Sequence, residues 1–161
     1  MKKVISVLVV AACLLGLAGV ASALGVGDAL PVVKMESFND KGEVTNATLK
    51  GNNTVLLFFN TSCSICRGEL QDVMKVHAAK KNFEVVLVNI DMNYEKRLPG
   101  YIDAMKITVP VVTDPEFNFA RSFGLSSTPA LVVVDKEVKV KAIKKGYSGK
   151  MEELVALLKD L

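Results

Sequence analysis

The sequence predicts an α/β fold: a central mixed β-sheet with helices on both faces and an N-terminal β-hairpin. Three apolar segments, at 55–59, 85–90 and 130–134, have the composition of strands buried on both faces, and the first is uninterrupted. Segments with apolar residues at helical spacing alternate with the early runs, and another such segment ends the chain. This order is typical of a sheet sandwiched between helices.

The first residues have the composition of an export signal. Lys2 and Lys3 form a short basic start, and residues 4–24 carry no charge. The small residues at 21–23 offer the pattern that signal peptidases cleave. We interpret 1–23 as a signal peptide.

Two alternatives for this segment stay open. The apolar run is long enough to remain as a membrane anchor. Residues 10–13 resemble a lipobox, which would make Cys13 a lipidation site. All three interpretations place the folded part outside the cytoplasm, either in the periplasm or tethered to the membrane and facing outward.

A single domain follows the signal. Residues 24–28 are expected to be a linker, and 29–161 has the length of one domain. The hairpin is predicted to begin with a strand at 32–37. Turn residues occupy 39–42, and the return strand starts at 43–44.

The later elements are predicted from periodicity and punctuation. After 55–59 we expect a helix whose inner face carries Leu70, Val73, Met74 and His77, the strand 85–90, a polar connection at 91–99, a helix at 101–106 and an extended piece at 109–112. Then follow a helix at 115–123 capped by Asp114 and stopped by Gly124, the strand 130–134, an edge strand at 138–142 and a final helix capped by Ser148.

The chemistry is expected at the Cys63-Ser64-Ile65-Cys66 dithiol, where a buried strand gives way to a helix. Free N–H groups and the helix dipole stabilise a thiolate at such a position and lower the pKa of the thiol. Cys66 lies one turn further on, where it can resolve a mixed disulfide formed by Cys63. We therefore predict a redox-active disulfide. The alternative is an inert local bridge, which across so short a loop would contribute only about 2 kcal/mol.

A metal site at the dithiol is not expected. His77 is the only histidine, and on one helix it would lie roughly 16 Å from Cys66 along the axis. No second CxxC pair exists to complete a tetrahedral site. We predict no metal and no bound cofactor.

Two stretches resemble a known family. Residues 58–70 (FFNTSCSICRGEL) are similar to the active-site stretch of the TlpA/ResA-like branch of the thioredoxin superfamily. Residues 123–131 (FGLSSTPAL) are similar to the segment where that superfamily carries a cis-proline. The resemblance covers about 27–161 and implies a thioredoxin-like fold.

The resemblance also implies roles for five residues. Cys63 matches the exposed nucleophile, Cys66 its buried partner, and Pro129 the cis-proline. The backbone of Thr128 is expected to pair with an extended substrate. Glu69 matches the acid of the CxxCxxE pattern, which tunes the thiols and can relay a proton. The alternative for Glu69 is an ordinary exposed helix residue.

The chain departs from the family at the dithiol. Ser62 stands where the family usually has Trp, and the sequence contains no Trp. Between the cysteines, the pair Ser64-Ile65 replaces a pair that usually contains proline. Both changes alter the surroundings of the thiols.

The function expected from these features is an exported thiol–disulfide oxidoreductase, a reductase of disulfides in exported proteins. Apocytochrome c before haem attachment is one implied substrate. A membrane electron donor of the CcdA/DsbD kind is the implied partner, and a monomer is expected. Nucleic acid is not an expected partner, because two of the three net positive charges belong to Lys2 and Lys3.

The same residues disfavour three other functions. A disulfide-forming or isomerising protein of the same fold is disfavoured by the Glu69 pattern. A peroxidase would need the pattern PxxxTxxC, but Thr61 is two residues before Cys63 and the proline is absent. A redox-inactive binding module is disfavoured by the presence of Cys63, Cys66, Glu69 and Pro129 together.

Overall fold

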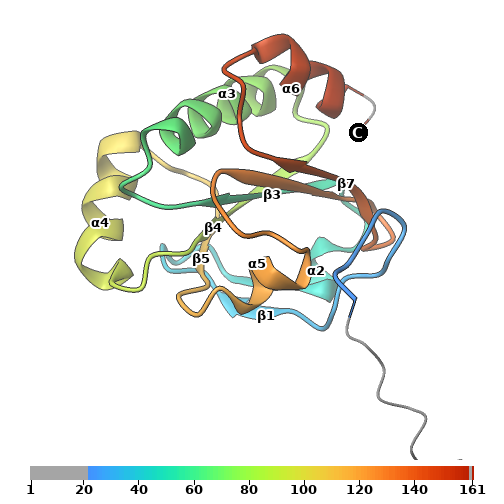
Figure 1. Cartoon of the computed structure of the whole chain (residues 1–161), viewed down its shortest axis with the longest axis horizontal. Helices are drawn as coiled ribbons and strands as arrows, with labels where there is room; N and C mark the ends of the chain where they lie inside the picture. Colours follow the sequence, from blue (N-terminus) through green and yellow to red (C-terminus); the bar gives the residue numbers. More distant parts are fainter. Residues whose placement is uncertain (1–21, 160) are drawn as a thin grey trace, which may run out of the picture.

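A five-stranded sheet in the order β5-β4-β3-β6-β7 forms the centre of the molecule in a computed structural model that describes residues 22–159 and 161 (Figure 1). β3, β4 and β5 are parallel to one another, β6 is antiparallel to β3, and β7 is antiparallel to β6. The predicted mixed sheet is confirmed. Its strands are β3 Thr54–Phe59, β4 Glu84–Asn89, β5 Val111–Thr113, β6 Ala130–Val134 and β7 Val140–Lys145.

Helices cover both faces of the sheet. α3 (Ser64–Lys80), α4 (Tyr94–Met105) and α6 (Met151–Leu158) pack with one face, where side chains such as Leu57 and Leu131 point. The hairpin, α2 (Asn46–Leu49) and α5 (Asn118–Ser122) pack with the other. The predicted sandwich of helices and sheet is therefore confirmed.

The central strand β3 is buried along its whole length. Val55, Leu57 and Phe59 belong to the core under α3, whereas Leu56 and Phe58 belong to the core under α5. Successive side chains of a strand point to opposite faces, so an apolar run suits a strand covered on both sides. Burial on both faces fixes the position of β3, and the dithiol follows the end of this strand.

The N-terminal hairpin consists of β1 (Lys34–Glu36) and β2 (Glu43–Thr45). Its turn is attached to the sheet edge, because the Asn39 amide donates to the Val109 carbonyl and its oxygen accepts the Val111 N–H. The segment interpreted as a linker, 24–28, lies against the domain through backbone hydrogen bonds from Leu24 and Gly27.

The predicted helix at 101–106 begins earlier than expected. α4 starts at Tyr94 and contains Pro99, a residue that the sequence pattern assigns to a polar connection. Proline inside a helix removes one backbone hydrogen bond and crowds the preceding turn. Leu98 and Tyr101, on either side of it, are buried in the core, and their burial offsets that cost.

The predicted helix at 115–123 begins later than expected. α5 covers only 118–122, after a turn in which Phe117 adopts a positive φ. Asp114 still acts as the capping carboxylate, since it accepts the N–H groups of Phe119 and Ala120. Gly124, with φ +63°, ends the helix as predicted.

The final helix is not capped by Ser148. α6 has Lys150 at its N-cap position, and no side chain accepts a hydrogen bond there. Ser148 lies one residue before Gly149, whose positive φ turns the chain. The Ser148 hydroxyl accepts the Lys150 N–H and donates to Glu153 instead.

The interpretation of 1–23 as a signal peptide falls almost entirely on residues outside those the structure describes. Within 22–159 and 161, no helix has both the length and the apolar character needed to cross a membrane.

Candidate active site

Cys63 lies between the end of β3 and the start of α3, as predicted. β3 ends at Phe59, and Cys63 is the N-cap residue of α3. Its Sγ accepts the N–H of Cys66 at 3.1 Å. This sulfur therefore occupies the end of the helix at which unpaired N–H groups stabilise negative charge.

Polar contacts hold the loop before Cys63 in place. The Asn60 side chain accepts the Ser62 N–H, and the Asn60 carbonyl accepts the Cys63 N–H. The Thr61 N–H donates to the buried carboxylate of Asp91 at 3.0 Å. Asp91 follows β4, so the loop is attached to the neighbouring strand.

The two sulfurs form a disulfide and differ in accessibility. Cys63 and Cys66 are bonded, with their Cα atoms 5.2 Å apart. Cys63 is partly exposed, whereas Cys66 has no exposed surface. A thiol or disulfide from solution can therefore react only with the sulfur of Cys63.

Glu69 lies in the interior, next to the buried cysteine. It has no exposed surface, so the alternative of an ordinary exposed helix residue is wrong. Cys66 and Glu69 are three residues apart on α3, a spacing that puts them on one helix face with Cβ atoms roughly 5–6 Å apart. A carboxyl group thus lies one turn beyond the buried sulfur.

The charge of Glu69 is balanced by Lys144 of β7. The Lys144 Nζ lies 3.1 Å from Glu69 Oε1, and Oε2 has no hydrogen-bond partner among the described residues. Burial raises the pKa of Glu69, and Lys144 opposes that rise only in part. The carboxyl therefore keeps its proton to a higher pH than an ordinary glutamate does.

Tyr147 covers this ion pair from the outside. Its ring lies 5.1 Å from the Lys144 Nζ and packs over Gly68, where an added Cβ would lie 3.5 Å from it. Its hydroxyl donates to Asp72, which raises the pKa of Tyr147 to about 12. These contacts hold Tyr147 beside Lys144, whose side chain is only partly exposed, while Glu69 is fully enclosed.

Lys144 and Tyr147 are site residues that the sequence pattern does not predict. Continuing the alternation of 138–142 by two residues places Lys144 on the same face of the strand as Ala142. This pattern could have predicted that Lys144 points toward the site. The strand runs to Lys145, beyond the predicted end. A β-bulge between Val133 and Val134 also shifts its register.

The Thr128–Pro129 peptide is cis, as the resemblance implied. Ala130 pairs with Phe58 in the sheet, so Pro129 lies at the end of the sheet where β3 leads to Cys63. Pro129 is buried and its carbonyl accepts the Gly146 N–H at 2.9 Å, whereas Thr128 is partly exposed. The expected substrate-binding segment thus lies at the dithiol end of the sheet.

His77 lies on α3 and packs against the Phe83 ring, with centroids 5.4 Å apart. Within the part of the chain that the structure describes, no group of three or more His, Cys, Asp or Glu residues could hold a metal ion. His77 is thus a packing residue away from the dithiol.

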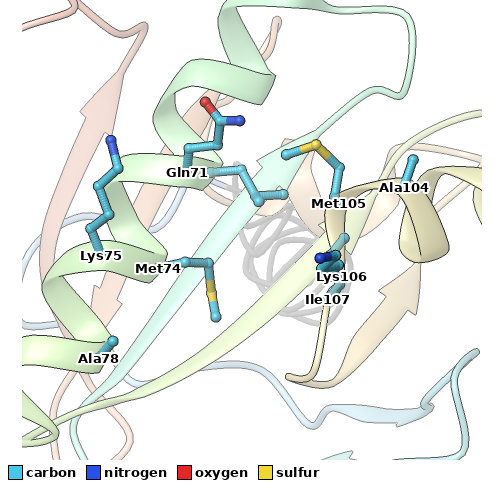
Figure 2. A pocket seen from close by; sticks show the side chains of 9 residues that line it. Gln71, Met74, Lys75, Ala78, Ala104, Met105, Lys106 and Ile107 are labelled. Carbon is cyan, nitrogen blue, oxygen red and sulfur yellow. The ribbon is translucent and has the colours of Figure 1, made fainter.

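Two hollows lie between α3 and α4. Figure 2 shows the larger, a mainly apolar groove of about 620 Å³ to which Met74 and Met105 contribute from the two helices. It begins at Leu70 and extends along α3 away from the cysteines. The smaller hollow, about 410 Å³, is lined by Ser62 and Arg67, which flank the dithiol in sequence.

Two of three similar proteins are named thiol–disulfide oxidoreductases. The chain is 26% identical to sporulation thiol-disulfide oxidoreductase A of Bacillus subtilis over 110 residues, 66% of this chain and 67% of that protein. It is 33% identical to tryparedoxin of Trypanosoma brucei brucei over 102 residues, 60% of this chain and 69% of that one. It is 26% identical to thiol-disulfide oxidoreductase ResA of Geobacillus thermodenitrificans over 106 residues, 63% and 59% of the two chains.

Solved structures show the same fold. A protein described as thiol:disulfide interchange protein DsbE from Chlorobium tepidum superposes with a TM-score of 0.76 at 23% identity, covering 86% of this chain and 98% of that one. StoA from Bacillus subtilis superposes with a TM-score of 0.64 at 22% identity, covering 77% and 93%. The sequence matches the AhpC/TSA family over residues 26–143. The chain therefore belongs to the AhpC/TSA family, and it is a thiol–disulfide oxidoreductase of the thioredoxin fold.

Proposed function

We propose that the protein is an exported reductase that transfers two electrons from its dithiol to disulfides of other exported proteins. The observation that carries the proposal is the enclosed Glu69 carboxyl, one helical turn beyond the buried Cys66 and paired with Lys144. A site of this kind combines an accessible sulfur, a protected sulfur and a buried carboxyl group whose pKa is raised. These are the groups that a two-step thiol exchange requires.

The first step uses Cys63. In the reduced protein its thiolate attacks one sulfur of the substrate disulfide, the substrate S–S bond breaks, and a mixed disulfide forms. The leaving substrate thiolate takes up a proton. The helix N-terminus favours the attacking thiolate, through the Cys66 N–H that points at Cys63 Sγ.

The second step uses Cys66. Its thiol loses a proton and attacks the Cys63 sulfur of the mixed disulfide, which forms the Cys63–Cys66 bond and releases the substrate as a dithiol. Glu69 is the group placed to accept that proton, because it shares a buried helix face with Cys66. Lys144 stabilises the carboxylate in its proton-accepting form.

Thr128 and Pro129 are assigned to substrate binding. They precede β6 at the dithiol end of the sheet, and Thr128 is partly exposed there. An extended substrate segment can hydrogen-bond to an exposed backbone of this kind. This contact would align the substrate disulfide with Cys63.

Export and recharging complete the proposal. The basic start and apolar run of 1–23 support export, and one structural neighbour is described as a secreted disulfide oxidoreductase of Mycobacterium tuberculosis. A reductase outside the cytoplasm must receive electrons across the membrane, hence a donor of the CcdA/DsbD kind. Apocytochrome c is the candidate substrate that the ResA-like resemblance implies. An intact mass beginning at Leu24, measured on protein from its own host, would support cleavage.

An insulin-reduction assay with a redox titration tests the enzymatic part of the proposal. The purified protein should reduce insulin disulfides with dithiothreitol as donor, and Cys63→Ala should abolish this. Equilibration in glutathione buffers, with thiols trapped by alkylation, gives the reduction potential. A value near that of thioredoxin, about −270 mV, supports a reductase, and one near −120 mV would make the protein a disulfide-forming enzyme.

A further inference from the structure

The smaller hollow beside the dithiol contains most of the chain's arginine. Of three arginines in the sequence, Arg67 and Arg97 line it and Arg121 does not. Ser62, directly before the nucleophilic Cys63, forms part of the same wall. A group bound here would lie next to the sulfur that attacks the substrate.

The positive charge of this hollow is not neutralised by protein acids. Neither Arg67 nor Arg97 forms an ion pair within 4.0 Å with an acid of the described chain. Asp91, whose charge acts on Tyr101 of the same hollow, is buried and already accepts the Thr61 N–H and the Asn89 amide. Both guanidinium groups are exposed to solvent and open to an incoming anion.

Each arginine is held in place while most of its donors stay unused. Arg97 of α4 donates one N–H to the Ser62 hydroxyl, which leaves four of the five guanidinium donors. Arg67 of α3 lies at the buried Tyr101 and opposes the rise that burial causes in the Tyr101 pKa. The Tyr101 hydroxyl engages at most one N–H of Arg67, so the other guanidinium donors stay available.

The wall of the hollow on α4 is open at Gly100. A Cβ built there meets no atom within 4 Å. Glycine in a helix costs about 1 kcal/mol relative to alanine, so the residue does not serve the helix itself. Gly100 lines the hollow and adds no side chain to it.

We propose that this hollow is a subsite for a carboxylate carried by the substrate next to its disulfide, held by Arg67 and Arg97. The inference rests on the proposed reductase function and names its substrate class: disulfides with an acidic group beside the reacting cysteine. Guanidinium groups bind carboxylates through charge-assisted hydrogen bonds, often two at once. A carboxylate anchored there would bring the neighbouring substrate sulfur to Cys63.

Three small disulfides of similar size test the charge preference. The prereduced protein is mixed with 3,3′-dithiodipropionate, bis(2-hydroxyethyl) disulfide or cystamine, which are anionic, neutral and cationic. Acid-quenched samples are followed by mass spectrometry, and each gives a second-order rate constant. Arg67→Gln and Arg97→Gln should each lower the ratio of anionic to neutral rates by about two- to fivefold, as expected for partly exposed ion pairs. The ratio for the wild type should also fall at high salt.

Comparing ratios separates binding from thiol activation. Loss of a cation near Cys63 also raises its pKa, but that change would slow all three substrates by a common factor. Arg121→Gln is the matched control, since Arg121 lies on α5 and outside the hollow, and its ratio should equal that of wild type. Gly100→Glu supplies a competing carboxylate and should also abolish the preference for the anion.

The outcomes divide clearly. A protein that reduces all three disulfides with unchanged ratios in every arginine variant would overturn the subsite and leave the reductase intact. A protein that reduces none of them would overturn the reductase proposal and the subsite with it. Two disulfide peptides that differ only in having Glu or Gln beside the cysteine show whether the carboxylate comes from a polypeptide or from a small molecule. Discrimination here assigns the subsite to acidic polypeptides, whereas discrimination among the small disulfides alone assigns it to small acidic thiols.

Discussion

Glu69 is a carboxyl enclosed by protein, and Lys144 is the only cation paired with it among the described residues. Burial without a partner would hold the group neutral, and a cation at 3.1 Å makes ionisation less costly. Its pKa is raised on balance. A carboxyl with a raised pKa, one helical turn from Cys66, is suited to exchange a proton with that thiol.

Glu69→Gln should change the titration of the dithiol. The substitution removes a negative charge one turn from Cys66, so the apparent pKa of the thiols should fall, because a thiolate loses a like-charged neighbour. The titration belongs to the coupled pair of thiols. Turnover with insulin should fall too, since the proton acceptor for Cys66 is gone. Thiolate absorbance against pH, with one turnover assay, measures both effects.

The matched control for this variant is Glu95→Gln, which removes an exposed carboxylate in the first turn of α4. Its thiol titration should follow the wild type. If the Glu69→Gln curve and turnover also matched the wild type, Glu69 would be removed from the site.

Lys144→Met should destabilise the oxidised protein in a pH-dependent way. The Glu69 carboxylate then loses its partner, which costs about 3 kcal/mol at pH 8 for a buried charge. The raised pKa of Glu69 means that the folded state binds its proton more tightly than the unfolded state. The folded protein therefore loses stability as the pH rises through the folded-state pKa of Glu69. Removal of Lys144 raises that pKa further, so the pH range over which stability is lost extends to higher pH. Denaturant unfolding at pH 4 and pH 8 should show the larger loss at pH 8.

Two further variants isolate the Lys144–Glu69 pair. Lys145→Met removes the same charge from the next residue, whose Nζ contacts the Gly124 carbonyl, and it should show no comparable pH dependence. The double variant Lys144→Met, Glu69→Gln should recover most of the loss, because no charge is left unpaired. Additive losses in the double variant would mean that the two residues do not act on each other.

The residues of the site divide by how they are encoded. Cys63, Cys66 and Glu69 lie within one turn-and-helix segment, so spacing alone places them together. Lys144 and Arg97 reach the site from distant strands and helices, and a single sequence contains no record of such contacts. The resemblance supplied Pro129, whose cis bond local composition does not specify.

At the scale of elements, the start of α3 assigns different roles to the two cysteines. Cys63 occupies the N-cap and is partly exposed, whereas Cys66 lies in the first turn and is buried. Helix N-termini lower thiol pKa values, and burial in apolar surroundings raises them. Both effects make Cys63 the more reactive thiol.

Limited alkylation of the reduced protein at neutral pH should therefore label Cys63 first. Peptide mapping by mass spectrometry separates Cys63 from Cys66, and from Cys13 where the first residues are retained. Cys66→Ala should be labelled at nearly the wild-type initial rate, and Cys63→Ala far more slowly. Faster labelling at Cys66 would reverse the roles assigned here.

The elements that the sequence misplaced share a cause. At α4 and α5, local signals from Pro99 and Pro115 predicted boundaries that tertiary contacts overrode. Burial of Leu98 keeps Pro99 inside a helix, and a turn with Phe117 at positive φ moves the start of α5 to Asn118. Strands such as β3 and β6 were predicted closely, because burial on both faces leaves a continuous apolar run in the sequence.

At the scale of the whole molecule, the parts of the site converge at one end of the sheet. β3 leads to the dithiol, β6 begins after Pro129, and β7 supplies Lys144. The alternation of buried strands and helices predicted this class of fold, but not the register that aligns the strand ends. That register is set by pairing across the sheet, such as Phe58 with Ala130.

A protein that reduces others passes through a covalent intermediate, and removal of Cys66 should trap it. In Cys66→Ala the nucleophile still attacks, but the resolving thiol is missing, so mixed disulfides with substrates should accumulate. The tagged full-length variant is purified from its own host after acid quenching and alkylation, and bound proteins are released with reductant and identified. Cys63→Ala, which keeps only the buried thiol, is the control and should bring down far less. Equal recovery from the two variants, or none from either, would contradict exchange directed at protein substrates. Recovery of exported proteins whose reacting cysteines have acidic neighbours would support both the reductase and its carboxylate subsite.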